Sequence, residues 1–133
     1  MKMKPRLFFT LFVLILSSNS FSQSLIFCES VDKYGHEINP ADTFDISWQG
    51  GTLCVLLKTG HTLNTDSVNL EIYDVDSAGE AVLNGKITID VQKNWLFCWK
   101  KLLFKDDGRY KINAYSAENI LLGTGELFIR KEK

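Results

Sequence analysis

The feature that most constrains the fold of this chain is a two-residue alternation of apolar and polar side chains. It is clearest where Phe44, Ile46 and Trp48 alternate with polar residues. Successive side chains of a β-strand point to opposite sides, so this pattern predicts a strand with one buried face. No segment after residue 22 keeps a helical period of 3.6 residues for long. We therefore expect an all-β protein.

Turn residues divide the chain into short strand candidates. The segment 52–58 is apolar on both faces, as a central strand would be. The segment 95–104 is the longest apolar run, and its aromatic residues favour a strand over a helix. Seven or eight short strands in about 110 residues predict an antiparallel sandwich or barrel. The expected strands are 25–31, 43–48, 52–58, 68–75, 81–83 with 86–91 as one strand or a pair, 95–104, 109–116 and 121–130.

The first 22 residues have the three parts of an export signal. Three basic residues within the first six precede an apolar run at 7–16, and Ser20 and Ser22 fit the positions before a cleavage site. Ten helical residues cover roughly 15 Å, about half of the hydrocarbon core of a membrane, so an anchor is disfavoured. We expect cleavage before Gln23 and export to the periplasm or the cell exterior. Residues 23–133 then form one domain that does not insert into a membrane.

The charge of the predicted mature chain excludes two classes of partner. It keeps all sixteen acidic residues but loses three of the fifteen basic ones, which leaves a net charge of −4. Binding to nucleic acid or to an anionic membrane needs a basic surface. Neither partner is expected.

One short motif indicates which kind of β fold the chain adopts. Asp106, Gly108 and Tyr110 stand in a D-x-G-x-Y pattern that resembles the entry to strand F of immunoglobulin-like domains. The resemblance implies an immunoglobulin-like antiparallel β-sandwich over residues 23–133. It also implies that Gly108 allows a sharp turn, that Asp106 bonds local amides, and that the Tyr110 hydroxyl bonds an upstream backbone group.

Two departures narrow the resemblance. Ile112 stands two residues past Tyr110, where an antibody-type domain has a cysteine, and the strand 68–75 has no tryptophan. The chain therefore resembles the fibronectin-III-like or bacterial Ig-like members, which lack the disulfide between the sheets.

No catalytic, metal or cofactor site is expected. His36 and His61 both lie in polar segments, and no nucleophile motif accompanies them. The acidic segment 74–80 hints at a calcium loop, but Ala78 stands where a third ligand is needed, so a polar turn is favoured. We expect no enzyme.

The aromatic residues offer two interpretations. Trp95, Phe97 and Trp99 alternate along one strand and so share a face. We expect them in the core, because burial of a large aromatic side chain is strongly favourable. If they were exposed, Trp95 and Trp99, with Trp48, would form a platform for stacking sugars, as in carbohydrate-binding modules.

The three cysteines are Cys28, Cys54 and Cys98. If Trp95, Phe97 and Trp99 face inward, Cys98 faces outward, and alternation within 52–58 places Cys54 opposite to Leu53 and Val55. The resemblance makes the strands 52–58 and 95–104 neighbours in one sheet. This gives the hypothesis that Cys54 and Cys98 lie side by side on the outer face and form a disulfide.

The same alternation predicts an interface. It places Leu56, Leu96 and Leu102 on that outer face as an apolar patch, which would contact a protein partner or a second copy. The alternative is that another part of the chain covers the face. The expected function is therefore that of an exported, non-enzymatic interaction module, which contacts its partner by this face or by a sheet edge. A carbohydrate-binding module is the alternative.

Overall fold

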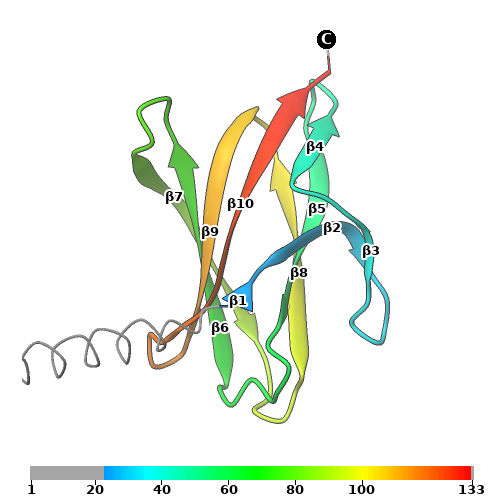
Figure 1. Cartoon of the computed structure of the whole chain (residues 1–133), viewed down its shortest axis with the longest axis vertical. Helices are drawn as coiled ribbons and strands as arrows, with labels where there is room; N and C mark the ends of the chain where they lie inside the picture. Colours follow the sequence, from blue (N-terminus) through cyan, green and yellow to red (C-terminus); the bar gives the residue numbers. More distant parts are fainter. Residues whose placement is uncertain (1–22, 133) are drawn as a thin grey trace, which may run out of the picture.

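The computed structural model describes residues 23–132, which form ten strands in two sheets and contain no helix (Figure 1). The six-stranded sheet contains β1 (Gln23–Ser24), β4 (Thr43–Ile46), β6 (Ser67–Val75), β7 (Ala81–Asp90), β9 (Gly108–Ser116) and β10 (Leu121–Lys131). The four-stranded sheet contains β2 (Ile26–Val31), β3 (Glu37–Pro40), β5 (Gly51–Lys58) and β8 (Phe97–Phe104). The predicted all-β sandwich is confirmed, with ten strands in place of seven or eight.

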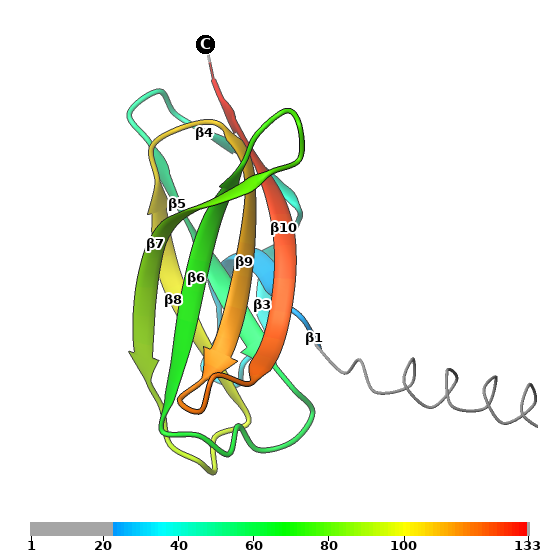
Figure 2. The same cartoon turned by 90° about the vertical axis from the view of Figure 1, so that its left-hand side faces the viewer.

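The two sheets stack face to face, with β7, β6, β9 and β10 side by side in one layer and β8 and β5 behind them (Figure 2). The strand orders are β1-β10-β9-β6-β7, with β4 also on β10, and β3-β2-β5-β8. Both β1 and β4 pair with β10 in parallel, and every other pairing of named strands is antiparallel. The predicted antiparallel sandwich thus includes two short parallel strands, both on the outer edge of β10.

The long strands lie where the alternation predicts them. The strands β5, β6, β9 and β10 each start and end within one residue of the expected bounds. The strand β3 was not expected, because Pro40 ends it and its residues do not alternate. The strand β4 ends at Ile46, which leaves Trp48 in the following turn. The predicted signal peptide, residues 1–22, lies outside the described residues.

The core is the layer between the two sheets. From β5 it receives Leu53, Val55 and Leu57, as the alternation predicts. The opposing sheet contributes buried apolar side chains from three central strands: Val68, Leu70, Ile112, Ala114, Leu127 and Ile129. Full burial of such a side chain contributes about 1.5–3 kcal/mol relative to exposure.

The orientation of β8 is the reverse of the expected one. Cys98, Leu102 and Phe104 lie in the core, whereas Trp99 and Leu103 lie outside with 40% and 59% of their surface exposed. The physical reason is the register with β5, where Leu57 is opposite Cys98 and Leu53 is opposite Leu102. Residues opposite each other in an antiparallel pair share a face, so the inward side of β5 fixes the inward side of β8.

The chain crosses between the two sheets at Leu25, which lies between β1 and β2. Leu25 and Phe27 are both buried in the core. A Cβ atom on Gly125 of β10 would lie 2.8 Å from the Phe27 ring. Glycine at this position lets the crossing segment pack directly against the β10 backbone.

The turn before β9 has the geometry of a tyrosine corner. The Tyr110 hydroxyl donates a hydrogen bond of 2.8 Å to the Asp106 carbonyl, and Gly108 has a φ of +142° that disfavours other residues. The Tyr110 ring packs edge-on against Phe104, with 4.9 Å between the ring centroids. Asp106 takes part through its backbone carbonyl; its carboxylate is exposed, 3.9 Å from the ammonium group of Lys131.

Candidate binding site along the β8 edge

One side of the sandwich ends in two strands that each have a single neighbour. In the four-stranded sheet β8 pairs only with β5, and in the six-stranded sheet β7 pairs only with β6. Each strand therefore has one row of backbone N–H and C=O groups without a partner strand. Such edges are sites for the addition of another strand.

The start of β8 borders a groove of about 780 Å³, here called the aromatic groove. Its exposed apolar side chains are Trp95, Leu96 and Trp99, with exposed fractions of 41%, 59% and 40%. Large side chains so exposed beside one another indicate a binding surface. The lining comprises Val31, Asp32, Lys33, Ile89 and residues 94–99.

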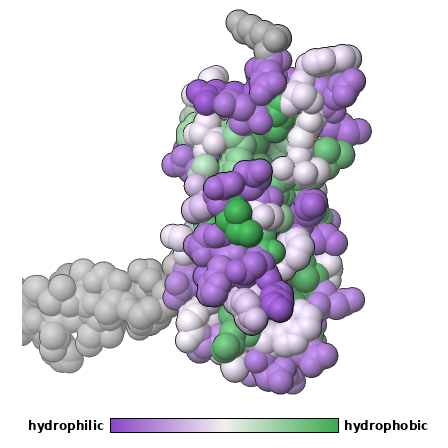
Figure 3. Space-filling model, turned by 90° about the vertical axis from the view of Figure 1, so that its right-hand side faces the viewer, coloured by the Kyte–Doolittle hydropathy of each residue, from purple (hydrophilic) through white to green (hydrophobic). Residues whose placement is uncertain are grey.

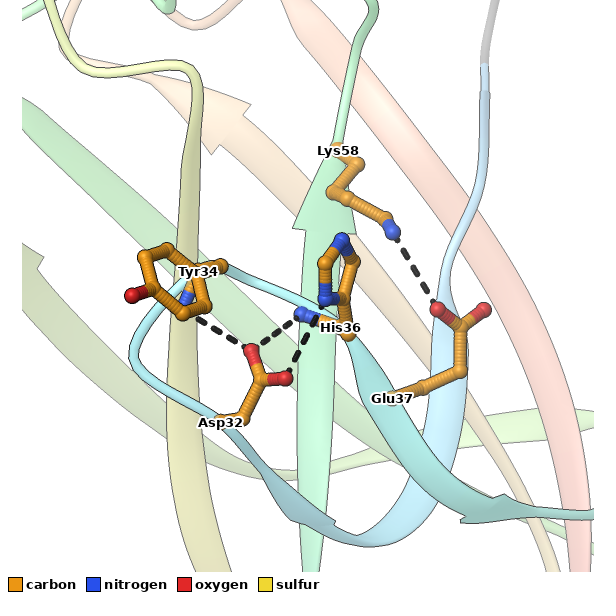
Figure 4. Close-up of polar contacts among 5 residues, drawn as sticks. All are labelled: Asp32, Tyr34, His36, Glu37 and Lys58. Atoms are coloured by element: carbon orange, nitrogen blue, oxygen red, sulfur yellow. Dashed lines mark hydrogen bonds and ion pairs between the residues drawn. The ribbon is translucent and has the colours of Figure 1, made fainter.

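The turn between β2 and β3 forms one wall of the aromatic groove. The Asp32 carboxylate accepts hydrogen bonds from the backbone N–H groups of Tyr34 (2.8 Å) and His36 (2.9 Å), and its second oxygen lies 3.1 Å from Nδ1 of His36 (Figure 4). These contacts, above all the one from the His36 N–H, hold the pKa of Asp32 below its ordinary value of 3.8. The carboxylate therefore fixes the turn in its ionised form.

The β2–β3 hairpin lies over the outer face of the four-stranded sheet. A Cβ atom on Gly35, at the turn, would lie only 2.6 Å from the Phe97 ring, so the turn sits directly on this side chain. The Lys58 ammonium donates a hydrogen bond of 3.1 Å to Glu37 on β3 (Figure 4). Seen from the side of β3, the surface is mainly hydrophilic with scattered apolar areas (Figure 3).

The predicted apolar interface is therefore wrong in two of its three members. Leu56 does point to the outer face, but it is 0% exposed. Leu102 lies in the core, because β8 has the reverse orientation. Leu96 alone is exposed, at the aromatic groove. The β2–β3 hairpin covers part of this face, at Phe97, whereas Trp99 and Leu103 on the same face stay exposed.

A second groove, of about 330 Å³, follows the other half of β8. It separates the end of β8 from β7 and is lined by Ile72, Asn84, Gly85, Ile87, residues 101–106 and Tyr110. The two grooves together border β8 over most of its length, on the side where it has no partner strand. The β8 edge, with both grooves, is the candidate site.

The charged residues of β8 itself are all basic, whereas Asp32 and Asp106 line the two grooves beside it. Lys100, Lys101 and Lys105 lie in or just after the strand, and residues 94–105 include no acidic residue. Lys100 is opposite Val55, a core residue, and so stands on the core-facing side of β8, yet it remains exposed. A charge on the inward side of an edge strand disfavours pairing with an apolar strand that brings no opposite charge.

The predicted pair of Cys54 and Cys98 is wrong. Cys54 is opposite Lys101 and Cys98 is opposite Leu57, so the two thiols lie on different faces of the sheet. Burial raises the pKa of Cys98 to about 12. The residue opposite Cys54 on its other side is Cys28, on β2.

The predicted aromatic platform is divided between two places. Trp95 and Trp99 border the aromatic groove, contrary to the expectation that they lie in the core. Trp48 is 72% exposed in the turn before β5, three residues before Gly51, which is opposite Phe104 at the far end of β8. It therefore does not belong to the same surface.

The described residues contain neither a cluster of metal ligands nor a membrane-spanning helix. Within residues 23–132, no group of three or more His, Cys, Asp or Glu side chains is placed to hold a metal ion. Over the same range, no helix is long and apolar enough to span a membrane.

Comparisons with known proteins place the fold. The chain is similar to an immunoglobulin-like protein of Pseudomonas aeruginosa, with a TM-score of 0.51 and 9% identity over 83% of this chain and 94% of that one. The domain is an immunoglobulin-like β-sandwich. It is also similar to a superoxide reductase (neelaredoxin) of Ignicoccus hospitalis, with a TM-score of 0.40 and 12% identity over 86% of this chain and 85% of that one. No family model and no curated protein matches the sequence.

Proposed function

We propose that this chain is an exported, non-enzymatic recognition module that binds an extended segment of another protein along the β8 edge. The observation that carries the proposal is the unpartnered edge of β8, bordered by two grooves along its length. An added strand would pair with the β8 backbone, and its side chains would enter the grooves.

The lysines of β8 indicate which residues a bound segment would carry. Lys100 and Lys101 would pair with Asp or Glu residues of the incoming strand, whereas Trp95, Leu96 and Trp99 would contact its apolar residues. Because Lys100 and Lys101 lie on opposite faces of β8, the ligand is then an extended segment with two consecutive acidic residues flanked by apolar ones. A second copy of this chain is disfavoured at the same edge, because two β8 strands would bring their lysines together.

A selection from displayed random nine-residue peptides tests the proposal. We expect enriched sequences to carry two consecutive Asp or Glu residues flanked by apolar residues and to lack proline, which cannot complete a strand ladder. A selected peptide should slow the exchange of backbone amides within residues 97–104. Enrichment of basic or proline-rich sequences, or binding without new amide protection in β8, would overturn strand addition.

Matched lysine variants locate the binding. Lys100→Gln should weaken the selected peptide about fivefold, equivalent to roughly 1 kcal/mol. Lys86→Gln removes an exposed lysine from the β7 edge in the other sheet and should leave the affinity unchanged. Equal losses in both variants would show that general charge, rather than the β8 edge, attracts the peptide.

A glycan is the second candidate ligand, and the exposed Trp95 and Trp99 support it. Sugars stack on aromatic faces, and Asp32 and Asn94 at the groove offer polar groups beside them. A glycan array distinguishes the candidates: retention of an oligosaccharide that Trp99→Ala abolishes, with no peptide enriched, would replace the peptide proposal.

A further inference from the structure

Cys28 and Cys54 stand directly opposite each other on neighbouring strands. The register of the antiparallel pair β2–β5 matches Ile26 with Leu56, Phe27 with Val55, and Cys28 with Cys54. Opposite residues share a face, with Cα atoms about 4.5 or 5.5 Å apart. A disulfide accepts Cα separations of about 4.4–6.8 Å, so this pair meets the backbone requirement without a shift of either strand.

The side-chain surroundings of the two thiols agree with the register. The Cys28 Sγ lies 3.9 Å from the Cys54 carbonyl, and the Cys54 Sγ lies 3.8 Å from the Glu29 carbonyl. Each thiol is thus within contact distance of the other strand's backbone at the same level of the ladder. Cys28 and Cys54 are 0% and 1% exposed.

The β2–β3 hairpin covers this pair. At Cys28 the strand β2 is paired on both sides, with Cys54 and with Pro40 of β3. Beyond Cys28, β2 pairs only with β3, and the hairpin turns over the outer face towards Phe97. The cysteines therefore mark the place where the wall of the aromatic groove leaves the sheet.

We propose that Cys28 and Cys54 form a cross-strand disulfide when the chain folds in the presence of an external disulfide oxidant. One thiolate attacks the oxidant, which releases one reduced thiol and forms a mixed disulfide; the second thiolate then attacks the protein sulfur and releases the other thiol. Two protein thiols are oxidised, and the oxidant's disulfide is reduced to two thiols.

Timing and selectivity follow from burial. Burial raises the pKa of both thiols, so each is a poor nucleophile once the hairpin covers it. Exchange therefore takes place before the hairpin closes or during its opening. Cys98 is excluded from the pair, because it lies on the core side of β8, opposite Leu57.

The bond would fix one wall of the candidate site. It would close a loop between residues 26 positions apart, and this loop contains the whole hairpin. Val31, Asp32 and Lys33, which line the aromatic groove, follow Cys28 within five residues. Oxidation would therefore restrict the opening of the groove at the side of the hairpin.

Refolding of the full chain in glutathione buffer tests the inference. The reduced, denatured protein is diluted into a mixture of glutathione and glutathione disulfide, quenched with acid, alkylated under denaturing conditions and mapped by mass spectrometry. We expect one alkylated cysteine, Cys98, and one linked peptide pair that contains Cys28 and Cys54. Three alkylated cysteines, a link that includes Cys98, or glutathione attached without an internal link would each overturn the inference.

Two variants provide matched controls. Cys98→Ser should form the same linked pair, whereas Cys54→Ser should form none and leave two alkylated cysteines. Addition of a reductant should lower the denaturation midpoint of the refolded wild-type protein and leave that of Cys54→Ser unchanged. Equal midpoints with and without reductant in the wild type would contradict the expected link. These results are independent of any ligand, so they do not depend on the proposed function.

Discussion

The long strands β10 and β8 differ in how their outer edges are covered, although the short strand β3 also has only one neighbour. On one side β10 pairs with β9 and also receives β1 and β4, so short segments of the chain's own backbone occupy its outer edge. On the other side β7 and β8 each keep one edge without a partner, and two grooves border β8. Short strands of two and four residues thus cover the outer edge of β10, whereas the long strand β8 keeps its outer edge unpaired beside the two grooves of the proposed site.

The largest expected effect is a difference in packing between β10 on one side of the sandwich and β7 on the other. Leu127 on β10 is 0% exposed, whereas Ile87 on β7 is only partly buried against the core. We expect Leu127→Ala to lower the free energy of unfolding by about 3 kcal/mol and Ile87→Ala by about 1 kcal/mol. Denaturant titrations measure both. Equal losses would show that the β7 side is packed as firmly as the β10 side.

The next effect concerns the corner beneath the second groove. Tyr110→Phe removes the hydrogen bond to the Asp106 carbonyl and should lower the free energy of unfolding by about 1 kcal/mol. Tyr34→Phe is the control, because Tyr34 is 67% exposed in the hairpin turn. Its unfolding midpoint should match that of the wild type. If both variants unfold at the midpoint of the wild type, the Tyr110 hydroxyl does not stabilise this corner of the fold.

The acid response should be local to the hairpin. The pKa of Asp32 is lowered mainly by the His36 N–H. That of Glu37 is lowered mainly by its own N–H and then by Lys58. Their ionised forms therefore stabilise the folded hairpin above their ordinary pKa values of 3.8 and 4.5, and this contribution is lost as the pH falls through the lowered values.

Residue-resolved amide exchange measures this response. Below about pH 4, protection should fall in residues 31–38 before it falls in β9 and β10. Asp32→Asn should weaken the acid dependence in the turn. A simultaneous loss of protection in the hairpin and in β10 would show that the hairpin does not open by itself.

The smallest expected effect is at the outer edge of β10, where β4 pairs with it. Arg130 of β10 and Asp45 of β4 form an exposed ion pair, with 2.9 Å between Nε and Oδ1. Asp45→Asn should change the free energy of unfolding by less than about 0.5 kcal/mol, because solvent screens exposed pairs. Thermal unfolding at low and high salt checks this. A large loss that disappears in salt would mean that charge, rather than backbone pairing, holds β4 on β10.

The strands that the sequence predicts well are those with a clear alternation. In β5 the apolar residues Leu53, Val55 and Leu57 are buried, and the ends of the segment are polar. Because β5 lies between two other strands, the residues on its other face are apolar as well. The D-x-G-x-Y pattern likewise indicates the turn, since Gly108 and Tyr110 each meet a specific backbone need there. These features depend on local geometry, which the sequence encodes directly.

The orientation of β8 could not be read from its own residues. Each of its two faces carries apolar side chains and one lysine: Lys100 on one face and Lys101 on the other. Side-chain size favoured the aromatic face as the buried one, but pairing with β5 decides the outcome. The β2–β3 hairpin was missed for a related reason, because its position over Phe97 depends on contacts between distant segments.

The inward position of Lys100 also bears on the solubility of the unliganded protein. Exposed strand edges tend to assemble into fibrils, and sequences resist this with charged gatekeeper residues. With valine in place of Lys100, the inner row of β8 from Cys98 to Phe104 would be uninterrupted and apolar, as aggregation-prone segments are. We therefore expect the Lys100 ammonium group to keep the unpaired β8 edge of one copy from joining that of another.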